Sequence, residues 1–150
     1  MMLSGTEGGK GMSDSDSGGQ VAQARILADR LRQAIEAAFA TDTDLLRRGR
    51  LVDTCCLIEI GAEQLVLTIR NGRPTVADRV PLLGSWNFAI RAGAEAWMAL
   101  WQPVPKPGWH DLFSLCKRGA MRIEGSLHPF MANLQYFKDL VTLPREGGPR

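Results

Sequence analysis

The sequence predicts a single α+β domain, and three observations carry this prediction. Residues 22–40 place apolar side chains at helical spacing. Residues 51–91 alternate apolar with polar side chains between turn residues, which is typical of strands. After residue 93 the helical period returns, with one further alternating run at 120–125. The 150 residues, 45% of them hydrophobic, are enough for one core.

Both ends of the chain are expected to lie outside this domain. Residues 1–20 are mainly glycine, serine and aspartate and can bury little apolar surface, so we expect a flexible tail there. The domain is expected to span residues 21–143, followed by a short tail at 144–150. The segment GTEGGKG resembles a phosphate-binding loop only superficially, because no strand precedes it and Gly11 follows the lysine where serine or threonine is needed.

The first predicted helix spans residues 22–40. Its apolar side chains repeat at spacings of three and four, and arginines and a glutamate occupy the other side. The apolar positions are Leu27, Leu31, Ala34, Ile35 and Ala38.

Four strands are expected to follow this helix. The first two cover residues 51–61 and 63–72, and the pair Asn71-Gly72 predicts a tight turn into a third strand at 74–79. Pro74 favours an edge position for the third strand, because proline has no N–H to donate to a neighbour. The fourth strand is predicted at 84–93, where the apolar side chains that should share one face are Trp86, Phe88 and Ile90.

The last third of the chain predicts three helices and one strand. The helices cover 94–101, 109–118 and 126–143, and the strand covers 120–125. Gly119 suits the end of the second helix, and Ser126 and Pro129 suit the start of the third. The first helix has its apolar positions at Trp97, Leu100 and Trp101, and the second at Trp109, Leu112, Phe113 and Cys116. The strand has Met121 and Ile123 on one face, and the last helix has Phe130, Leu134, Phe137 and Val141 on its apolar side.

Charge and cysteine usage exclude several classes of function. The net charge of +2 argues against a nucleic-acid-binding protein, which usually concentrates more positive charge. The dense basic cluster Arg47, Arg48 and Arg50 is interpreted as an exposed turn, with a contact to phosphate or anionic lipid as the alternative. Three cysteines without framework spacing, and a start without a signal peptide, predict a cytoplasmic location. Cys55 and Cys56 are adjacent in a strand, so one should lie in the core and the other on the opposite face.

Candidate catalytic residues are few, and the prediction is that the protein is not an enzyme and uses no cofactor or metal. His110 and Asp111 are neighbours in sequence and do not face each other on a helix. Cys116 is interpreted as a small buried side chain, although Lys117 and Arg118 could lower the pKa of its thiol. The alternative hypothesis, an enzyme that uses Cys116 or His110, predicts that these two side chains share a cleft.

The order of these elements resembles the sterol-carrier-protein type 2 domain. The segments SWNFAIRAGAEAWMALWQP and KRGAMRIEGSLHPFMANLQYF carry the likeness. Gly119, Met121, Ile123 and Gly125 fill a G-x-L-x-I-x-G pattern, and Trp97 fills the position of a helix aromatic. Ser126 departs from the family, which commonly has aspartate there. The likeness covers roughly residues 22–142 and is that of a small, stand-alone bacterial-type member.

This resemblance implies a five-stranded mixed sheet with helices on one face and an apolar cavity between them. Family members bind sterols, fatty acids, acyl-CoA or other apolar molecules without transforming them, and some small bacterial members are associated with quinone-lipid metabolism. The resemblance therefore implies a fatty acid, an acyl-CoA, a quinone or another lipid as the ligand rather than a sterol, and a transient membrane-surface contact fits such a carrier. The alternative is an accessory protein-interaction subunit of the same fold with a filled core, and a homo-oligomer fits either reading. The side chains expected to contact a ligand are Trp97, Trp101, Phe113, Met121, Ile123, Phe130, Leu134 and Phe137.

Overall fold

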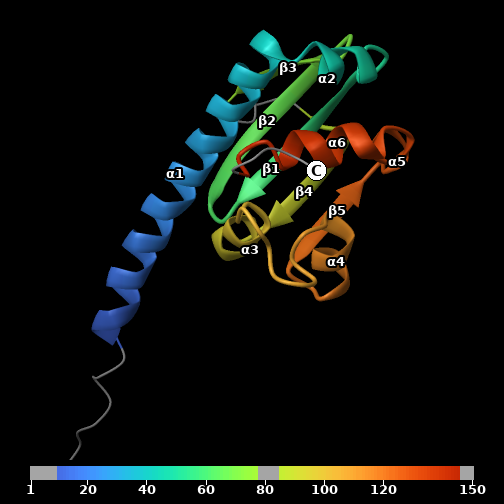
Figure 1. Cartoon of the computed structure of the whole chain (residues 1–150). Helices are drawn as coiled ribbons and strands as arrows, with labels where there is room; N and C mark the ends of the chain where they lie inside the picture. Colours follow the sequence, from blue (N-terminus) through green and yellow to red (C-terminus); the bar gives the residue numbers. More distant parts are fainter. Residues whose placement is uncertain (1–9, 78–84, 146–150) are drawn as a thin grey trace, which may run out of the picture.

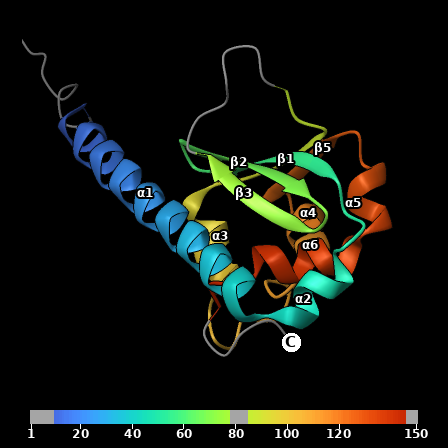
Figure 2. The same cartoon turned by 90° about the horizontal axis from the view of Figure 1, so that it is seen from above.

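The computed structural model describes residues 10–77 and 85–145 and confirms the α+β class. Five strands form one mixed sheet in the order β3-β2-β1-β4-β5, and the helices lie on one side of it (Figure 1, Figure 2). Only β1 and β4 pair in parallel; the other neighbours are antiparallel. The strands are β1 (Thr54–Ile60), β2 (Glu63–Arg70), β3 (Arg73–Ala77), β4 (Phe88–Ala92) and β5 (Met121–Gly125).

The strand predictions are confirmed in type and order. β3 lies at an edge of the sheet, as Pro74 predicted, and Asn71 and Gly72 form the preceding turn with positive φ angles of 54° and 79°. Residues 78 and 79 of the predicted third strand, and residue 84 of the fourth, lie outside the described residues. The helices are α1 (Lys10–Thr41), α2 (Thr43–Arg48), α3 (Ala94–Leu100), α4 (Leu112–Lys117), α5 (His128–Ala132) and α6 (Leu134–Val141).

The first helix is longer than predicted, because α1 begins at Lys10 rather than near residue 22. Part of the predicted tail is therefore helical, and Figure 1 shows this end of α1 projecting beyond the sheet. Extension of an existing helix adds one backbone hydrogen bond per residue and needs no apolar side chains, so apolar periodicity does not reveal it. From Gly18 onward, where side-chain burial is described, Ala24 is the first buried residue of α1.

Deletion of residues 1–20 is expected to leave the melting temperature within a degree or two of the intact protein. Gly18, Gly19 and Gln20 are exposed, and a Cβ added at either glycine would meet no atom within 4 Å. Thermal denaturation followed by circular dichroism tests this. A fall of more than about 5 °C, on the order of 1 kcal/mol for a domain of this size, would contradict it.

One hydrophobic core fills the space between the sheet and the helices. It receives alternate residues of the strands, among them Cys56 and Ile58 of β1, and the apolar side of α1. Leu27, Leu31 and Ile35 of α1 are buried there, as their spacing predicted. The remaining larger core side chains include Leu65, Leu67, Ile69, Phe88, Ile90, Trp97, Leu100, Trp101, Leu112, Leu115, Met121, Phe130, Tyr136, Phe137, Leu140 and Val141.

The opposite face of the sheet has a smaller apolar cluster. It contains Leu57, Val66 and Ala89, with the half-buried Cys55 and Trp86 against them. Cys55 and Cys56 therefore lie on opposite faces, as predicted. The expectation that Trp86 shares a face with Phe88 and Ile90 is wrong, because β4 begins only at Phe88 and the alternation of a strand does not extend into the residues before it.

The C-terminal helices differ from the prediction at their ends. The expected helix 126–143 is two helices, because Asn133 leaves the helical conformation, with φ −127° and ψ 38°. Ser126 is not the cap of α5: Leu127 holds that position and no side chain caps it, while Pro129 lies in the first turn as predicted. The expected helix 109–118 begins only at Leu112, after Asp111 accepts a hydrogen bond from the Phe113 N–H.

Candidate apolar binding site

The eight predicted contact residues divide into two groups. Four of them line one apolar pocket between α4, β5 and α5: Phe113, Met121, Ile123 and Phe130. The other four lie outside the lining of this pocket and pack into or against the main core: Trp97, Trp101, Leu134 and Phe137.

The apolar pocket has a volume of about 380 Å³. Met121 and Phe130 are almost completely buried in it, whereas Phe113, Leu127 and Met131 are 39%, 41% and 53% exposed. The buried side chains therefore belong to the interior of the pocket and the exposed ones to its solvent side. The full lining is Phe113, Cys116, Met121, Arg122, Ile123, Glu124, Leu127, Phe130 and Met131.

Two glycines set the positions of the three elements around this pocket. After α4, Gly119 adopts a φ of 79°, and the N–H of Ala120 bonds to the carbonyl of Leu115, which closes the helix. After β5, Gly125 adopts a φ of 103°, and the N–H of Ser126 bonds to the carbonyl of Asn87. The chain thus turns sharply on each side of β5, and α4 and α5 are brought to the same strand.

Trp97 and Trp101 form part of the packed interior. The indole N–H of Trp97 donates to the carbonyl of Glu59 at 2.9 Å, and that of Trp101 donates to the carbonyl of Val141 at 2.7 Å. The two rings lie 5.5 Å apart between their centroids. Both polar atoms are therefore satisfied within the chain, as buried indoles require. Their role as ligand contacts stays a prediction.

Three phenylalanine rings form a compact cluster beside the pocket. Phe88 of β4 lies 5.1 Å from Phe137 and 5.5 Å from Phe130, measured between ring centroids. Phe130 and Phe137 are 5.9 Å apart. These are ordinary distances for packed aromatic pairs. The rings meet in the layer where the resemblance predicts a cavity, and Phe130 is the member that also reaches the pocket between α4, β5 and α5.

The residues considered for catalysis do not assemble into a site. Cys116 lines the apolar pocket, whereas His110 is exposed and lines a polar pocket with Arg145. The two therefore do not share the cleft that the enzyme hypothesis predicts. Burial raises the pKa of the half-buried Cys116 thiol, and the charge of Asp111 adds to this, which favours the interpretation as a packed side chain over a thiol activated by Lys117 and Arg118.

Asp111 caps the start of α4 and pairs with Lys138 of α6. Burial opposes ionisation of its carboxyl, but an ion pair with Lys138 at 2.7 Å and backbone N–H groups of α4 outweigh burial and lower its pKa. Within residues 10–77 and 85–145, no group of three or more histidine, cysteine or acidic side chains is placed to hold a metal ion.

The basic cluster at Arg47, Arg48 and Arg50 is largely compensated within the chain. Arg47 and Arg48 pair with Asp44 at 2.7 and 3.0 Å, and Arg48 also pairs with Asp139 at 2.5 Å. Arg50 donates to the carbonyl of Arg47. These contacts favour the exposed-turn interpretation over a phosphate site.

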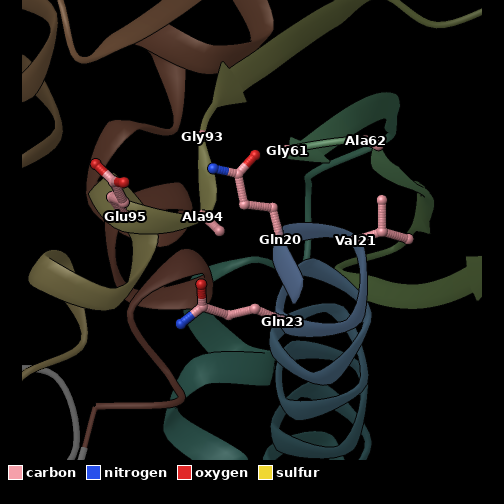
Figure 3. A pocket seen from close by; sticks show the side chains of 8 residues that line it. All are labelled: Gln20, Val21, Gln23, Gly61, Ala62, Gly93, Ala94 and Glu95. Carbon is pink, nitrogen blue, oxygen red and sulfur yellow. The ribbon is translucent and has the colours of Figure 1, made fainter. Parts of the chain in front are cut away.

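A second pocket, of about 440 Å³, was not predicted from the sequence. It lies between α1, the turn from β1 to β2, and the start of α3 (Figure 3). Small residues at both turns leave the space open, and the side chains around it carry two amides and one carboxylate. The lining therefore mixes these polar groups with small apolar residues. Its residues are Gln20, Val21, Gln23, Gly61, Ala62, Gly93, Ala94 and Glu95.

Comparison with known proteins identifies the fold. No family model matches the sequence, and the search of curated proteins gave no match. A UbiJ-SCP2 ubiquinone synthesis protein superposes with a TM-score of 0.53 at 16% identity, over 80% of this chain and 96% of that one. The sterol carrier protein domain 2 of Helicoverpa armigera gives 0.53 at 11%, over 75% and 84%. Sterol carrier protein 2 from Yarrowia lipolytica gives 0.52 at 10%, over 79% and 88%.

These neighbours confirm the predicted sterol-carrier-like fold. At such low identity they show the fold alone, so the ligand, the partner and the residues that contact them are not transferred by the comparison. In the residues that the structure describes, no helix is both long enough and apolar enough to span a bilayer.

Proposed function

We propose that this chain is a non-catalytic binder of an apolar, lipid-like molecule such as a fatty acid, an acyl-CoA or a quinone-related lipid. The observation that carries the proposal is the apolar pocket between α4, β5 and α5, on a fold shared with sterol carrier proteins. We further propose that a cytoplasmic carrier uses this pocket to shield the apolar part of the ligand from water.

The lining of the pocket suits an apolar ligand of variable shape. Burial of each CH₂ group of a ligand contributes about 0.8 kcal/mol without any fixed polar partner. Phe113 and Phe130 supply rigid aromatic walls, and Met121 and Met131 supply flexible thioethers that adapt to irregular shapes. A volume of about 380 Å³ lies at the small end of the range for ligand sites, so we expect one chain or one ring to be enclosed rather than a whole lipid.

Ile123→Asp is expected to weaken binding of a neutral fluorescent fatty alcohol by at least tenfold, because it places a carboxylate in the apolar wall of the pocket. Val76→Asp is the matched control, since Val76 is also a half-buried apolar residue of an edge strand and lies on β3, at the other edge of the sheet. Fluorescence titration measures affinity, and thermal denaturation checks that both variants fold. Equal weakening by the two substitutions would contradict a site at β5.

The alternative function is an accessory protein-interaction subunit with a filled core. The packed rings of Phe88, Phe130 and Phe137 favour it, because they occupy the layer where a large cavity was expected. The same titration separates the two proposals. Wild-type protein that binds neither the neutral alcohol nor a fatty acid nor an acyl-CoA would favour the accessory subunit.

A further inference from the structure

Three of the large apolar side chains exposed in the described residues gather at one place. Phe113, Leu127 and Met131 all line the solvent side of the apolar pocket. The others are scattered over the molecule, on α1 and in separate loops. Single exposed apolar residues are ordinary, whereas a cluster of three around a pocket indicates an interaction surface. Figures 1 and 2 place α4, β5 and α5 on the side of the domain away from α1.

Basic side chains accompany this cluster. Lys117 follows Phe113 by four positions, so both lie along the same side of α4. Arg122 of β5 lines the pocket and is exposed. Among the residues that the structure describes, neither Lys117 nor Arg122 has a carboxylate within 4.0 Å.

The acidic residue of the pocket offsets this charge only in part. Glu124 is held by Arg91 at 2.5 Å, and Arg91 is also bonded to Glu59 at 2.9 Å. Two carboxylates share this one guanidinium, so the group keeps one negative charge, against the two positive charges of Lys117 and Arg122. The ammonium of Lys138 lies 5.0 Å from the centre of the Phe113 ring, but its ion pair with Asp111 at 2.7 Å means that it adds no net charge. Among the described residues, this face therefore combines exposed apolar side chains with a small net positive charge from Lys117 and Arg122.

We propose that this α4–β5–α5 face docks on the surface of an anionic lipid bilayer. Apolar side chains of a docked face enter the boundary between headgroups and acyl chains, and lysine and arginine beside them attract anionic headgroups. Phe113, Leu127 and Met131 have the exposure that the first role needs, and Lys117 and Arg122 have the free charge for the second. An acidic groove of another protein is less well matched, because it does not explain why the apolar cluster opens into a pocket.

Membrane docking would give the ligand a path into the pocket, and its role in this sense rests on the proposed function. A docked face would hold the pocket against the acyl region, so an apolar ligand would exchange between bilayer and pocket without crossing water. Docking itself does not require ligand binding, because the charged and exposed residues that produce it lie at the rim. The two proposals therefore fail separately.

Flotation with phospholipid vesicles tests the docking. The intact chain is expected to bind vesicles of phosphatidylcholine with phosphatidylglycerol at least tenfold more strongly than vesicles of phosphatidylcholine alone. Lys117→Glu with Arg122→Glu is expected to reduce that binding by at least twentyfold, since each cation near an anionic surface contributes about fivefold. Leu127→Ser with Met131→Ser is expected to reduce binding on both vesicle types. All four substituted residues, Lys117, Arg122, Leu127 and Met131, are exposed, so the variants are expected to fold. Thermal denaturation checks this.

The controls carry the same changes elsewhere. Arg50→Glu with Arg73→Glu alters the net charge equally, and Leu51→Ser with Val104→Ser removes two exposed apolar side chains from other loops. Vesicle binding that falls equally in the control and test variants would overturn the proposal. Absence of binding between the wild-type protein and anionic vesicles would also overturn the proposal. Binding of a polyglutamate peptide through Lys117 and Arg122, without vesicle binding, would indicate an acidic protein partner instead. Lys117→Glu alone changes a residue outside the lining of the pocket, so this variant is expected to keep its affinity for the neutral fatty alcohol while it loses vesicle binding.

Discussion

Phe137→Ala is expected to lower the free energy of unfolding by about 3–5 kcal/mol, the cost of removing a fully buried phenylalanine from a packed core. Phe137 is completely buried. Its ring contacts those of Phe88 and Tyr136, with centroids at 5.1 and 5.3 Å. Chemical denaturation measures the loss. The sequence-based hypothesis of a cavity at this position predicted a clearly smaller loss, so the experiment separates a filled layer from a hollow one.

Phe113→Ala is the matched control for this measurement. It removes the same ring from the solvent side of the apolar pocket, where the side chain is 39% exposed, and should cost much less than Phe137→Ala. Similar and small losses for both variants would show that Phe137 also faces open space. That result would restore the predicted cavity between sheet and helices.

Gly125→Ala is expected to destabilise the fold by on the order of 3 kcal/mol, from the sum of backbone strain and collision. The φ angle of Gly125 is 103°, a conformation that residues with a Cβ rarely adopt. An added Cβ would also lie 2.7 Å from the carbonyl oxygen of Asn87 and 3.0 Å from the Cα of Phe88. Both neighbours are backbone atoms of the adjoining chain segment and cannot rotate away. Thermal and chemical denaturation measure the loss.

Gly119→Ala isolates the two contributions. Gly119 has a φ of 79°, but a Cβ there would meet no atom within 4 Å. Its substitution should therefore cost only the strain, about 1–2 kcal/mol. Equal losses at Gly119 and Gly125 would contradict the collision, and a Gly125 variant of full stability would contradict both terms.

The type and order of the elements could be predicted because they depend on local periodicity. The alternation in residues 63–72 and the Asn71-Gly72 turn predicted β2 and the hairpin, and apolar spacing predicted the packed part of α1. The ends of elements depended on single contacts instead. The hydrogen bond from the Phe113 N–H to Asp111 starts α4, and the departure of Asn133 from helical geometry divides the last helix. Neither changes the hydrophobic pattern, so periodicity could not reveal them.

The candidate site was predicted only in part for a related reason. The apolar stripe of α4, the alternation of β5 and the stripe of α5 identified four lining residues, but the same pattern included Trp97, Trp101 and Phe137 of the interior. An apolar side chain carries no mark that distinguishes a pocket wall from a core. Leu127 and Met131 were missed because they fall off the buried stripe, and their exposure at a pocket is a property of the folded chain.

The parallel pairing of β1 with β4 has a consequence for synthesis of the protein. A parallel pair cannot be closed by a tight turn. One side of β1 pairs with β2 directly, but its other side stays unpaired until β4 has been synthesised. At about 5–20 residues per second, the ribosome completes β4 roughly 1–3 seconds after the end of β3, and it needs several seconds more to complete α6. During this interval the apolar side of the emerging meander has α1 as its cover but lacks α6. The nascent chain is therefore expected to be a client of ribosome-associated chaperones, and its yield should depend on them more than that of a helical bundle of equal length.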